Sequence, residues 1–336
     1  MRVDADSHID ETEATWEFMD DGDRYKPISI DPGVPTVPGD KRAHRRWVID
    51  GHFGVRRWRD DKRTGTTQIT RELIDVGARL RHLDELRIDV QVIYPTFMLY
   101  GISWPEGLTE PEAELALAHS YNRWLGSRTT ESQGRLRWVA VTPASTIDKA
   151  LEEIRWAKDH GACGVMPRGE VASQRSVSDP YFFPLYQEAS DLDLPICLHQ
   201  GSGSGPHLFT QLVTARIPEK FPSLRMGWIE TGASWVPYMC ADLQAKDKRL
   251  RPLNLKEDLF RSYRFYVTCE STDDIPYILQ FGTEDSLMVG TDYSHADQAS
   301  EIEALDIVEQ RAEQGQFSKE VARKILDDNP RRFYGL

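Results

Sequence analysis

The chain has 336 residues, of which 40% are hydrophobic and 28% charged, and its formal net charge is -13. This composition is that of a globular protein with a sizeable core, and it excludes a chain that is disordered throughout. The net negative charge argues against nonspecific binding to nucleic acid or to an anionic membrane, because both partners would repel the chain at long range.

Neither a leader nor a membrane span is indicated by the sequence. Its start lacks a basic patch followed by an apolar run, and no later stretch approaches the roughly 20 apolar residues that a span requires. We therefore expect a soluble, cytoplasmic protein. The cysteines are far apart, form no CxxC pair and mostly lie in apolar runs, so we interpret them as reduced and structural. They are Cys163, Cys197, Cys240 and Cys269.

Eight short apolar runs recur along the chain, each followed by polar or Gly/Pro residues and then by a segment with helical spacing. The runs cover residues 2–8, 90–96, 136–143, 162–168, 195–201, 224–231, 265–270 and 287–294. The helical segments cover residues 72–86, 112–129, 145–160, 182–191, 207–220, 236–246, 273–281, 299–313 and 321–327, the last with Ser318 as a possible cap. Strict alternation implies a parallel sheet, and eight units favour a closed (β/α)8 TIM barrel over an open doubly wound sheet. We predict one such domain over residues 1–336.

One predicted helix has a complete set of N-terminal capping residues. Thr109, Glu110, Pro111 and Glu112 supply a cap, an early proline and a carboxylate at the capping-box position.

A long excursion over residues 11–69 separates the first strand from the first helix. Its prolines indicate irregular structure, and its tryptophans and phenylalanines indicate that it packs onto something. Because loops after barrel strands lie on the catalytic face, we expect this insertion to cap the pocket. Within it, residues 41–63 hold nine Lys/Arg and three Asp. This basic stretch is a solvated face or a subunit contact, as in a homodimer, or it attracts an anionic substrate.

Ionisable residues stand where several of the predicted strands end. Asp4, Asp6 and His8 alternate along the first strand and so point to one side of it, where Asp6 and His8 could grip a metal ion. A solvated acidic terminus is the other interpretation. His199 ends the fifth strand, either as a satisfied core residue or as a ligand. Asp292 ends the eighth, where a buried carboxylate needs a cation partner.

In a closed barrel, Asp6, His8, His199 and Asp292 would all lie at carboxyl ends of strands around one centre. Two imidazoles and two carboxylates suit Zn²⁺ or Mn²⁺, with a position left for water or substrate. Such an ion would make hydroxide available near neutral pH.

These residues lie in segments that together resemble a known family. The segments VDADSHIDE, LPICLHQG, FPSLRMGWIETGASWVPY, GTDYSH and ILDDNPRRFYGL are similar to the amidohydrolase-related branch of the amidohydrolase superfamily, which includes aminocarboxymuconate-semialdehyde decarboxylase. The resemblance implies a (β/α)8 barrel with one divalent metal. It also implies that a first-strand pair, a fifth-strand His and an eighth-strand Asp hold the metal, which here are Asp6, His8, His199 and Asp292.

Two positions depart from the family pattern. The first ligand slot of the family often holds His and sometimes Glu, whereas this chain has Asp6, with a shorter reach. After the sixth strand, decarboxylases of this group commonly carry a His, whereas this chain has Glu230. A carboxylate can also serve as a general base, but with a different charge and pKa. The fourth strand, VMPRG, offers no lysine that could be carboxylated to bridge two metals, so one metal is expected.

Other residues are candidates for contacting a small, anionic substrate. Arg168 could clamp a carboxylate or form a structural ion pair. His207 and His295 follow the fifth and eighth strands and either line the pocket or lie in solvent, and His52 lies in the insertion. The run Gly201-Ser202-Gly203-Ser204-Gly205 lacks the features of a nucleotide loop and fits a flexible loop whose amides approach a ligand.

The hypothesis that these features favour is a mononuclear metal-dependent hydrolase of a small carboxylated or cyclic compound. Asp292 would take the proton of a metal-activated water, Glu230 would assist as acid or base, and His199 would complete the catalytic set. The first alternative is a non-oxidative metal-dependent decarboxylase of an aromatic or unsaturated carboxylic acid. The second alternative is a metal-stabilised binding protein without turnover.

Overall fold

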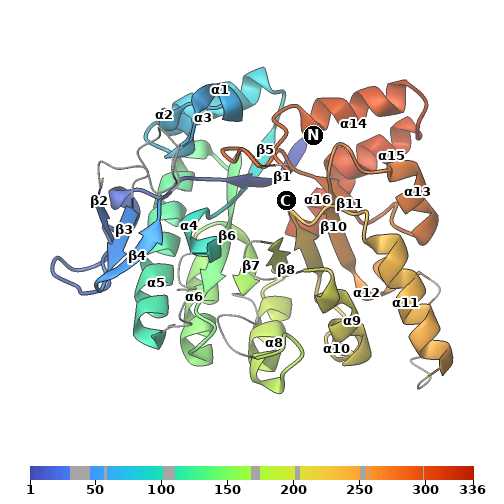
Figure 1. Cartoon of the computed structure of the whole chain (residues 1–336), viewed down its shortest axis with the longest axis horizontal. Helices are drawn as coiled ribbons and strands as arrows, with labels where there is room; N and C mark the ends of the chain where they lie inside the picture. The colour runs from blue at the N-terminus through green and yellow to red at the C-terminus, as the bar shows by residue number, and fades with distance from the viewer. Residues whose placement is uncertain are drawn as a thin grey trace, which may run out of the picture.

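Eight parallel strands form the centre of the computed structural model, which describes residues 1–30, 46–56, 59–100, 110–167, 175–200, 205–249, 255–256, 258–297 and 299–336. Their order in the sheet follows their order in the chain, and Figure 1 shows helices arranged around them. The strands are β1 (Val3–His8), β5 (Val90–Tyr94), β6 (Leu136–Thr142), β7 (Ala162–Pro167), β8 (Ile196–His199), β9 (Met226–Ile229), β10 (Phe265–Cys269) and β11 (Leu287–Val289). All eight predicted strands are confirmed, and so is the barrel.

The barrel closes between β1 and the segment that follows β11. The His8 amide donates to the Tyr293 carbonyl at 2.9 Å, and the Asp292 amide donates to the Asp6 carbonyl at 3.0 Å. Gly290 makes this approach possible, because a Cβ there would lie 2.3 Å from the Cβ of Asp6 and 2.7 Å from its amide nitrogen. The closure thus places the ionisable side chains of β1 next to those of residues 292–295.

The helical layer follows the predicted segments with several changes at their ends. Its main helices are α3 (Val76–Glu85), α5 (Pro111–Thr129), α6 (Ile147–Asp159), α8 (Phe183–Asp191), α9 (His207–Thr214), α10 (Ile217–Lys220), α11 (Val236–Arg249), α12 (Leu259–Tyr263), α13 (Ile275–Ile278), α14 (Ala304–Glu313), α15 (Lys319–Arg323) and α16 (Asn329–Tyr334). A π-helical turn (Lys324–Asp328) joins α15 to α16. Ser318 caps α15 as expected, since its side chain accepts from the Val321 amide.

Two helix predictions are wrong in detail. The segment 207–220 is broken into α9 and α10, because Arg216 adopts a left-handed conformation (φ 58°) and Pro218 opens a new turn. Glu110 is the N-cap residue of α5 and makes no side-chain capping bond, although Pro111 does open the helix. Thr109, the expected cap, lies outside the described residues.

The insertion contains regular structure that the sequence analysis did not predict. Strands β2 (Ile28–Ile30), β3 (Arg46–Ile49) and β4 (His52–Val55) form an antiparallel sheet beside the barrel (Figure 1). Asp50 and Gly51 join β3 to β4, both with positive φ (48° and 78°). Asp-Gly is the preferred pair for such a two-residue hairpin turn, so the signal was present in the sequence.

The insertion packs onto the turn that follows β5. The short helix η1 (Glu13–Trp16) and strand β3 place Trp16 and Trp47 against Phe97, at the start of α4 (Phe97–Tyr100), with each pair of ring centroids 6.0 Å apart. Both tryptophans are fully buried. The insertion is thus attached near the carboxyl ends of the first two barrel strands, while its role as a cap over the pocket stays a prediction.

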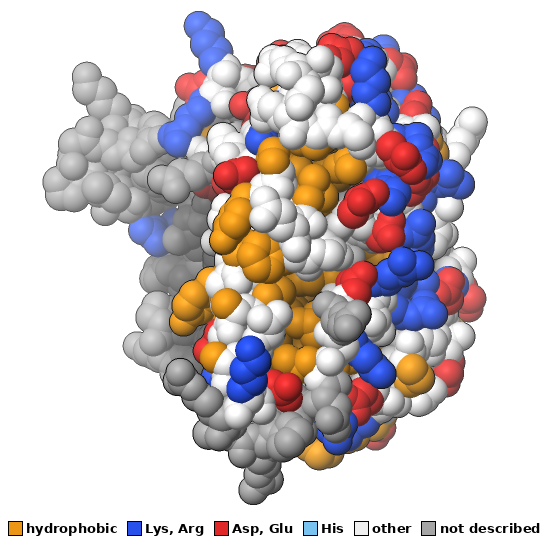
Figure 2. All heavy atoms as spheres, turned by 90° about the vertical axis from the view of Figure 1, so that its right-hand side faces the viewer, with side chains coloured by type: hydrophobic (Ala, Val, Ile, Leu, Met, Phe, Trp, Pro, Cys, Tyr) orange, Lys and Arg blue, Asp and Glu red, His pale blue; other side chains and the backbone are white. Residues whose placement is uncertain are grey.

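Figure 2 shows hydrophobic side chains gathered between acidic and basic ones on one side of the molecule, to which α11 and α13 belong. Tyr238 of α11 and Tyr277 of α13 are among the exposed large hydrophobic residues. Among the described helices, none combines the length and the apolar composition needed to cross a membrane.

Candidate metal centre

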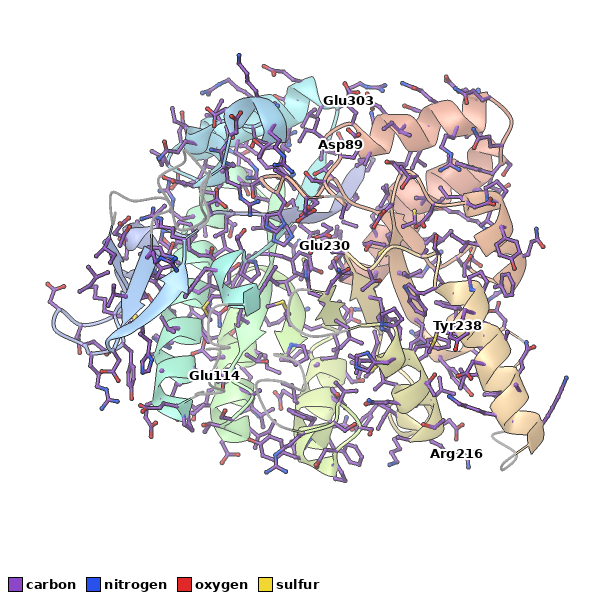
Figure 3. The ribbon with its side chains drawn as sticks, viewed as in Figure 1. Asp89, Glu114, Arg216, Glu230, Tyr238 and Glu303 are labelled. Atoms are coloured by element: carbon purple, nitrogen blue, oxygen red, sulfur yellow. The ribbon has the colours of Figure 1, made fainter. Side chains whose placement is uncertain are left out.

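Six ionisable side chains meet at the carboxyl ends of the barrel strands. They form two groups of potential ligand atoms that share His8, namely His8, Glu230, Asp292 and His295, and Asp6, His8 and His199. Figure 3 shows Glu230 near the middle of the barrel, where β9 ends. The four predicted metal ligands are therefore brought together, as are the other two candidates, Glu230 and His295.

His8 shows which of its nitrogens faces this centre. Its Nδ1 lies 2.6 Å from the Pro95 carbonyl oxygen, and because a carbonyl only accepts, Nδ1 carries the proton. The other nitrogen, Nε2, lies 3.2 Å from Asp292 Oδ1 and 3.4 Å from Asp6 Oδ1. In the neutral ring, Nε2 would point a lone pair at two carboxylates. A cation or a second proton must therefore lie between them.

Three of the distances between these atoms suit neighbouring ligands of a divalent ion. With bonds of about 2.0 to 2.2 Å, ligand atoms at adjacent corners of a tetrahedral site lie about 3.3 to 3.6 Å apart. The separation between His199 Nε2 and Asp6 Oδ1 is 3.5 Å, close to the two measured from His8. Asp6 Oδ1, His8 Nε2 and both Asp292 carboxylate oxygens are buried and make no hydrogen bond within the described part of the chain. The donor set and its burial therefore suit a metal ion.

His295, which was expected to line the pocket or lie in solvent, is itself part of the cluster. Its ring stacks on His8, and its Nδ1 is 2.7 Å from Asp292 Oδ1. Its Nε2 is 3.0 Å from the hydroxyl oxygen of Thr96. The turn after β5 thus contacts two imidazoles of the cluster, one through Pro95 and one through Thr96.

Asp292 and Glu230 both adopt the left-handed backbone conformation, with φ of 51° and 57°. This region is uncommon for residues other than glycine, asparagine and aspartate, and such residues cluster at functional sites. Glu230 directly follows β9, and its carboxylate lies 3.4 Å from His199 Nδ1 and 4.0 Å from His295 Nδ1. The strained turn therefore aims the Glu230 carboxylate at the cluster.

The two central aspartates have opposite pKa shifts. Burial raises the pKa of Asp6, but the imidazoles of His199 and His8 outweigh it and hold the pKa below its usual value. Burial, reinforced by the negative charges of Glu230 and Asp6, raises the pKa of Asp292 well above its usual value. The neighbouring imidazoles thus stabilise the charged form of Asp6, whereas the charged form of Asp292 is disfavoured unless a cation lies beside it.

Asp4 does not join the cluster, although it lies on the same strand. Its carboxylate accepts from Gln91 Nε2 (2.7 Å) and from the amide and hydroxyl of Thr291 (2.8 and 2.7 Å). Gln91 in turn accepts from the buried Arg79, whose guanidinium also donates to the His8 carbonyl. Burial raises the pKa of Asp4 to about 6, against these hydrogen bonds. This network joins β1, β5 and the segment after β11 behind the cluster.

A pocket opens directly beside the cluster. The described residues that line the pocket are Asp6, Glu230, Gly232, Thr268, Cys269, Glu270, Gly290, Asp292 and Ala299. Glu270 adds a further carboxyl group to the pocket wall, and burial together with the charge of Asp273 raises the pKa of this group. Among its described residues, this wall is rich in carboxyl groups and contains no lysine or arginine.

Of the remaining predicted substrate contacts, the two that the structure describes do not join this centre. Arg168 and the glycine run 201–204 lie outside the described residues. His207 is exposed at the start of α9, and His52 is half-buried in β4. Neither belongs to the groups of potential ligands.

Sequence reasoning missed Glu11 and Thr96, which lie next to this centre. Glu11 accepts from three backbone amides of the turn after β5, and the Thr96 hydroxyl contacts one ring nitrogen. No spacing rule identifies such contacts. The one available signal was that Glu11 and Thr96 lie two or three residues after strands that carry or adjoin ligands.

Comparisons with known proteins agree with this architecture. The family model described as Amidohydrolase matches residues 3–336. The 2-amino-3-carboxymuconate-6-semialdehyde decarboxylase of Dictyostelium discoideum is 20% identical over 297 residues, 78% of this chain and 77% of that protein. The amidohydrolase structure from Mycobacterium avium subsp. paratuberculosis K-10 aligns with a TM-score of 0.77 and 16% identity over 99% of both chains. The 2,6-dihydroxybenzoate decarboxylase structure from Rhizobium aligns with a TM-score of 0.61 and 19% identity over 78% of this chain and 88% of that one.

The chain belongs to the amidohydrolase family, since the family model covers nearly all of it. It is an enzyme of the amidohydrolase superfamily with a TIM barrel and a buried cluster of histidines and carboxylates able to hold a metal ion.

Proposed function

We propose that the protein is a non-oxidative, metal-dependent decarboxylase of a small aromatic or unsaturated carboxylic acid. This differs from hydrolysis, the hypothesis that the sequence alone favoured. The observation that carries its metal dependence is that His8 Nε2 lies 3.2 Å from Asp292 and 3.4 Å from Asp6, and His199 Nε2 lies 3.5 Å from Asp6, in one buried centre. Decarboxylases among the similar proteins, from Dictyostelium discoideum and Rhizobium, support this choice of reaction.

The reaction requires that a carbon–carbon bond breaks and that its electron pair remains on the substrate carbon, which then takes a proton as CO₂ leaves. A divalent ion, Zn²⁺ or Mn²⁺, would polarise the substrate by binding its carboxylate and a neighbouring hydroxyl group. Asp6, His8, His199 and Asp292 are the residues that would hold it. Orienting the scissile bond in the buried centre is then the main task of the protein.

Glu230 and Asp292 are the groups placed to move the proton. Both line the pocket beside the cluster, and both lie next to His295. A carboxyl group there could deliver the proton to the substrate carbon and recover it from water. His199 contacts both carboxylates, Asp6 through Nε2 and Glu230 through Nδ1.

Hydrolysis is the second candidate, and one observation favours it. Glu230 places a carboxylate, and not an imidazole, at the end of β9, within 3.4 Å of His199 Nδ1. A carboxylate there is suited to take a proton from an attacking water. The positions of the metal ligands would be the same for both reactions.

The two reactions differ in what enters the product. The test is to incubate the protein, with Zn²⁺ or Mn²⁺ added, with a panel of hydroxybenzoates and unsaturated dicarboxylic acids in heavy water, and a matched set of esters, amides and lactones in ¹⁸O water. The proposal predicts release of CO₂ and one deuterium on the product carbon. If an ester, amide or lactone yields a product that contains ¹⁸O and none of the acids releases CO₂, the protein is a hydrolase and the proposal of decarboxylation is wrong.

A further inference from the structure

Glu11 is a buried carboxylate that the proposed chemistry does not use. It follows β1 by three residues and is only 3% exposed. Its Oε1 accepts from the amides of Thr96 (3.0 Å) and Met98 (3.2 Å), and its Oε2 accepts from the amide of Phe97 (2.7 Å). These three amides belong to the turn 95–98, which joins β5 to α4.

The same turn holds two imidazoles of the candidate metal centre. The Pro95 carbonyl accepts from His8 Nδ1, and the Thr96 hydroxyl contacts His295 Nε2. A hydrogen bond to the far nitrogen of a ligating imidazole fixes its tautomer and ring orientation. Since the two rings also stack on each other, a shift of the turn would move both together.

The insertion holds this turn from a second side. Trp16 and Trp47 pack against the ring of Phe97, whose amide is one of the three that Glu11 binds. Glu11 is itself the first residue of the insertion. The turn is thus fixed by the insertion on its outer side and supports the two imidazoles on its inner side.

We infer that Glu11 is a positioning residue for the metal centre, acting on His8 and His295 through the turn 95–98. This inference rests on the proposed metal centre. Pro95 and Thr96 contact the two rings directly, and loss of such a partner typically lowers metal affinity 10- to 100-fold. Glu11 holds the turn that contains both. Glu11 would then link the conformation of the insertion to the metal site.

Glutamine at position 11 tests the inference, because it keeps the shape of the side chain. Its carbonyl oxygen can still accept hydrogen bonds, but its amide group would face a backbone N–H, donor against donor. Glu114 supplies a matched control. It is fully buried on α5, and its carboxylate accepts from the Ser145 amide at 2.9 Å. Figure 3 shows Glu114 in the helical layer, away from Glu230.

The experiment titrates Zn²⁺ into the metal-free full-length protein by competition with a chelator of known affinity, and measures urea unfolding of the same samples. We expect both Glu11→Gln and Glu114→Gln to be less stable than wild type, while only Glu11→Gln binds Zn²⁺ about 10-fold or more weakly. If both variants bind Zn²⁺ as tightly as wild type, the positioning role of Glu11 is overturned, while the proposed metal centre is not. A wild-type chain that binds no Zn²⁺ or Mn²⁺ would overturn the metal centre and this inference with it.

Three milder changes give the same answer if Glu11→Gln fails to fold. Glu11→Asp keeps the charge but shortens the reach, so its Zn²⁺ affinity should lie between those of wild type and Glu11→Gln. Thr96→Val removes the hydroxyl that contacts His295, and Thr96→Ser keeps it. We expect Thr96→Val alone of this pair to weaken Zn²⁺ binding. Wild-type affinity in both Glu11→Asp and Thr96→Val would contradict the inference.

Discussion

His8 and His295 stack face to face, with ring centroids 3.8 Å apart and ring planes inclined by 17°. They come from opposite ends of the chain, and the closure of the barrel between β1 and the segment after β11 brings them together. Both rings also contact Asp292 Oδ1, at 3.2 and 2.7 Å. Asp292 therefore stands where two imidazoles, the pocket and the strand ends meet.

Asp292→Asn should remove turnover while the fold remains. The substitution deletes a proton-transferring carboxylate and a candidate ligand, so kcat/KM for the acid that releases CO₂ should fall about 100-fold or more. The metal-free variant should unfold at no lower urea concentration than wild type, because burial already disfavours the charged form of this carboxyl group. Asp89→Asn is the control, since Asp89 lies just before β5, at the other end of the barrel, and is exposed. An active Asp292→Asn variant would exclude Asp292 from proton transfer.

Gly290→Ala should prevent the barrel from closing. The added methyl group would overlap the backbone of Asp6, which cannot move without breaking the pairing of β1. We expect a loss of about 3 kcal/mol in the free energy of unfolding, or no folded protein at all. Gly77→Ala in α3 should be neutral or slightly stabilising, since a Cβ there meets only polar side-chain ends and alanine favours helix. A stable Gly290→Ala protein with intact metal binding would disprove this account of the closure.

The stability that Glu11 contributes should depend on pH. Burial raises its pKa to about 7, against the hydrogen bonds from Phe97 and Met98, whereas in the unfolded chain it titrates near 4.5. The folded chain therefore holds this proton more tightly, so the contribution is complete below pH 4.5 and is lost as pH rises through 7. The difference in unfolding free energy between wild type and Glu11→Gln should shrink from pH 5 to pH 8, by at most about 3 kcal/mol. Urea titrations of the metal-free proteins measure this, and a constant or growing difference would contradict it.

All four cysteines should resist modification in the native protein. Cys163, Cys197, Cys240 and Cys269 are buried, as the sequence analysis expected. Burial raises the thiol pKa to about 12 for Cys163 and Cys269 and to about 11 for Cys240. Thiolate is the reactive form, so a thiol reagent at pH 8 should label fewer than one site per chain until urea is added. Rapid labelling of the native protein would show that one of these thiols is accessible.

The barrel was predictable because its strands are buried on both faces and therefore appear as separate apolar runs. The candidate ligands were predictable for a related reason. His199 and Asp292 follow apolar strands, where an unpaired ionisable group is costly, and parallel strands end at one rim. The Asp50-Gly51 turn shows the opposite case, in which a clear local signal was overlooked among the prolines and charges of the insertion.

The supports of the site were not predictable, because they depend on distances that only folding creates. Glu11 binds amides 85 to 87 residues away, and Pro95 contributes only its carbonyl. Likewise Asp4 alternates with Asp6 along β1, yet a register shift between Asp4 and Ser7 interrupts the pairing of β1 with β5 there, and Asp4 bonds to Gln91 and Thr291 instead. Spacing in the sequence could not distinguish a ligand from its support.

The most direct test of the metal centre is the metal content of the purified chain. After equilibration with Zn²⁺ or Mn²⁺ and removal of excess ions, we predict one equivalent per wild-type chain, and less than about a tenth of that in His8→Ala and in His199→Ala, each folded by circular dichroism. The Glu114→Gln variant should retain the full equivalent. A wild-type chain without metal, or histidine variants that keep one equivalent, would contradict the account.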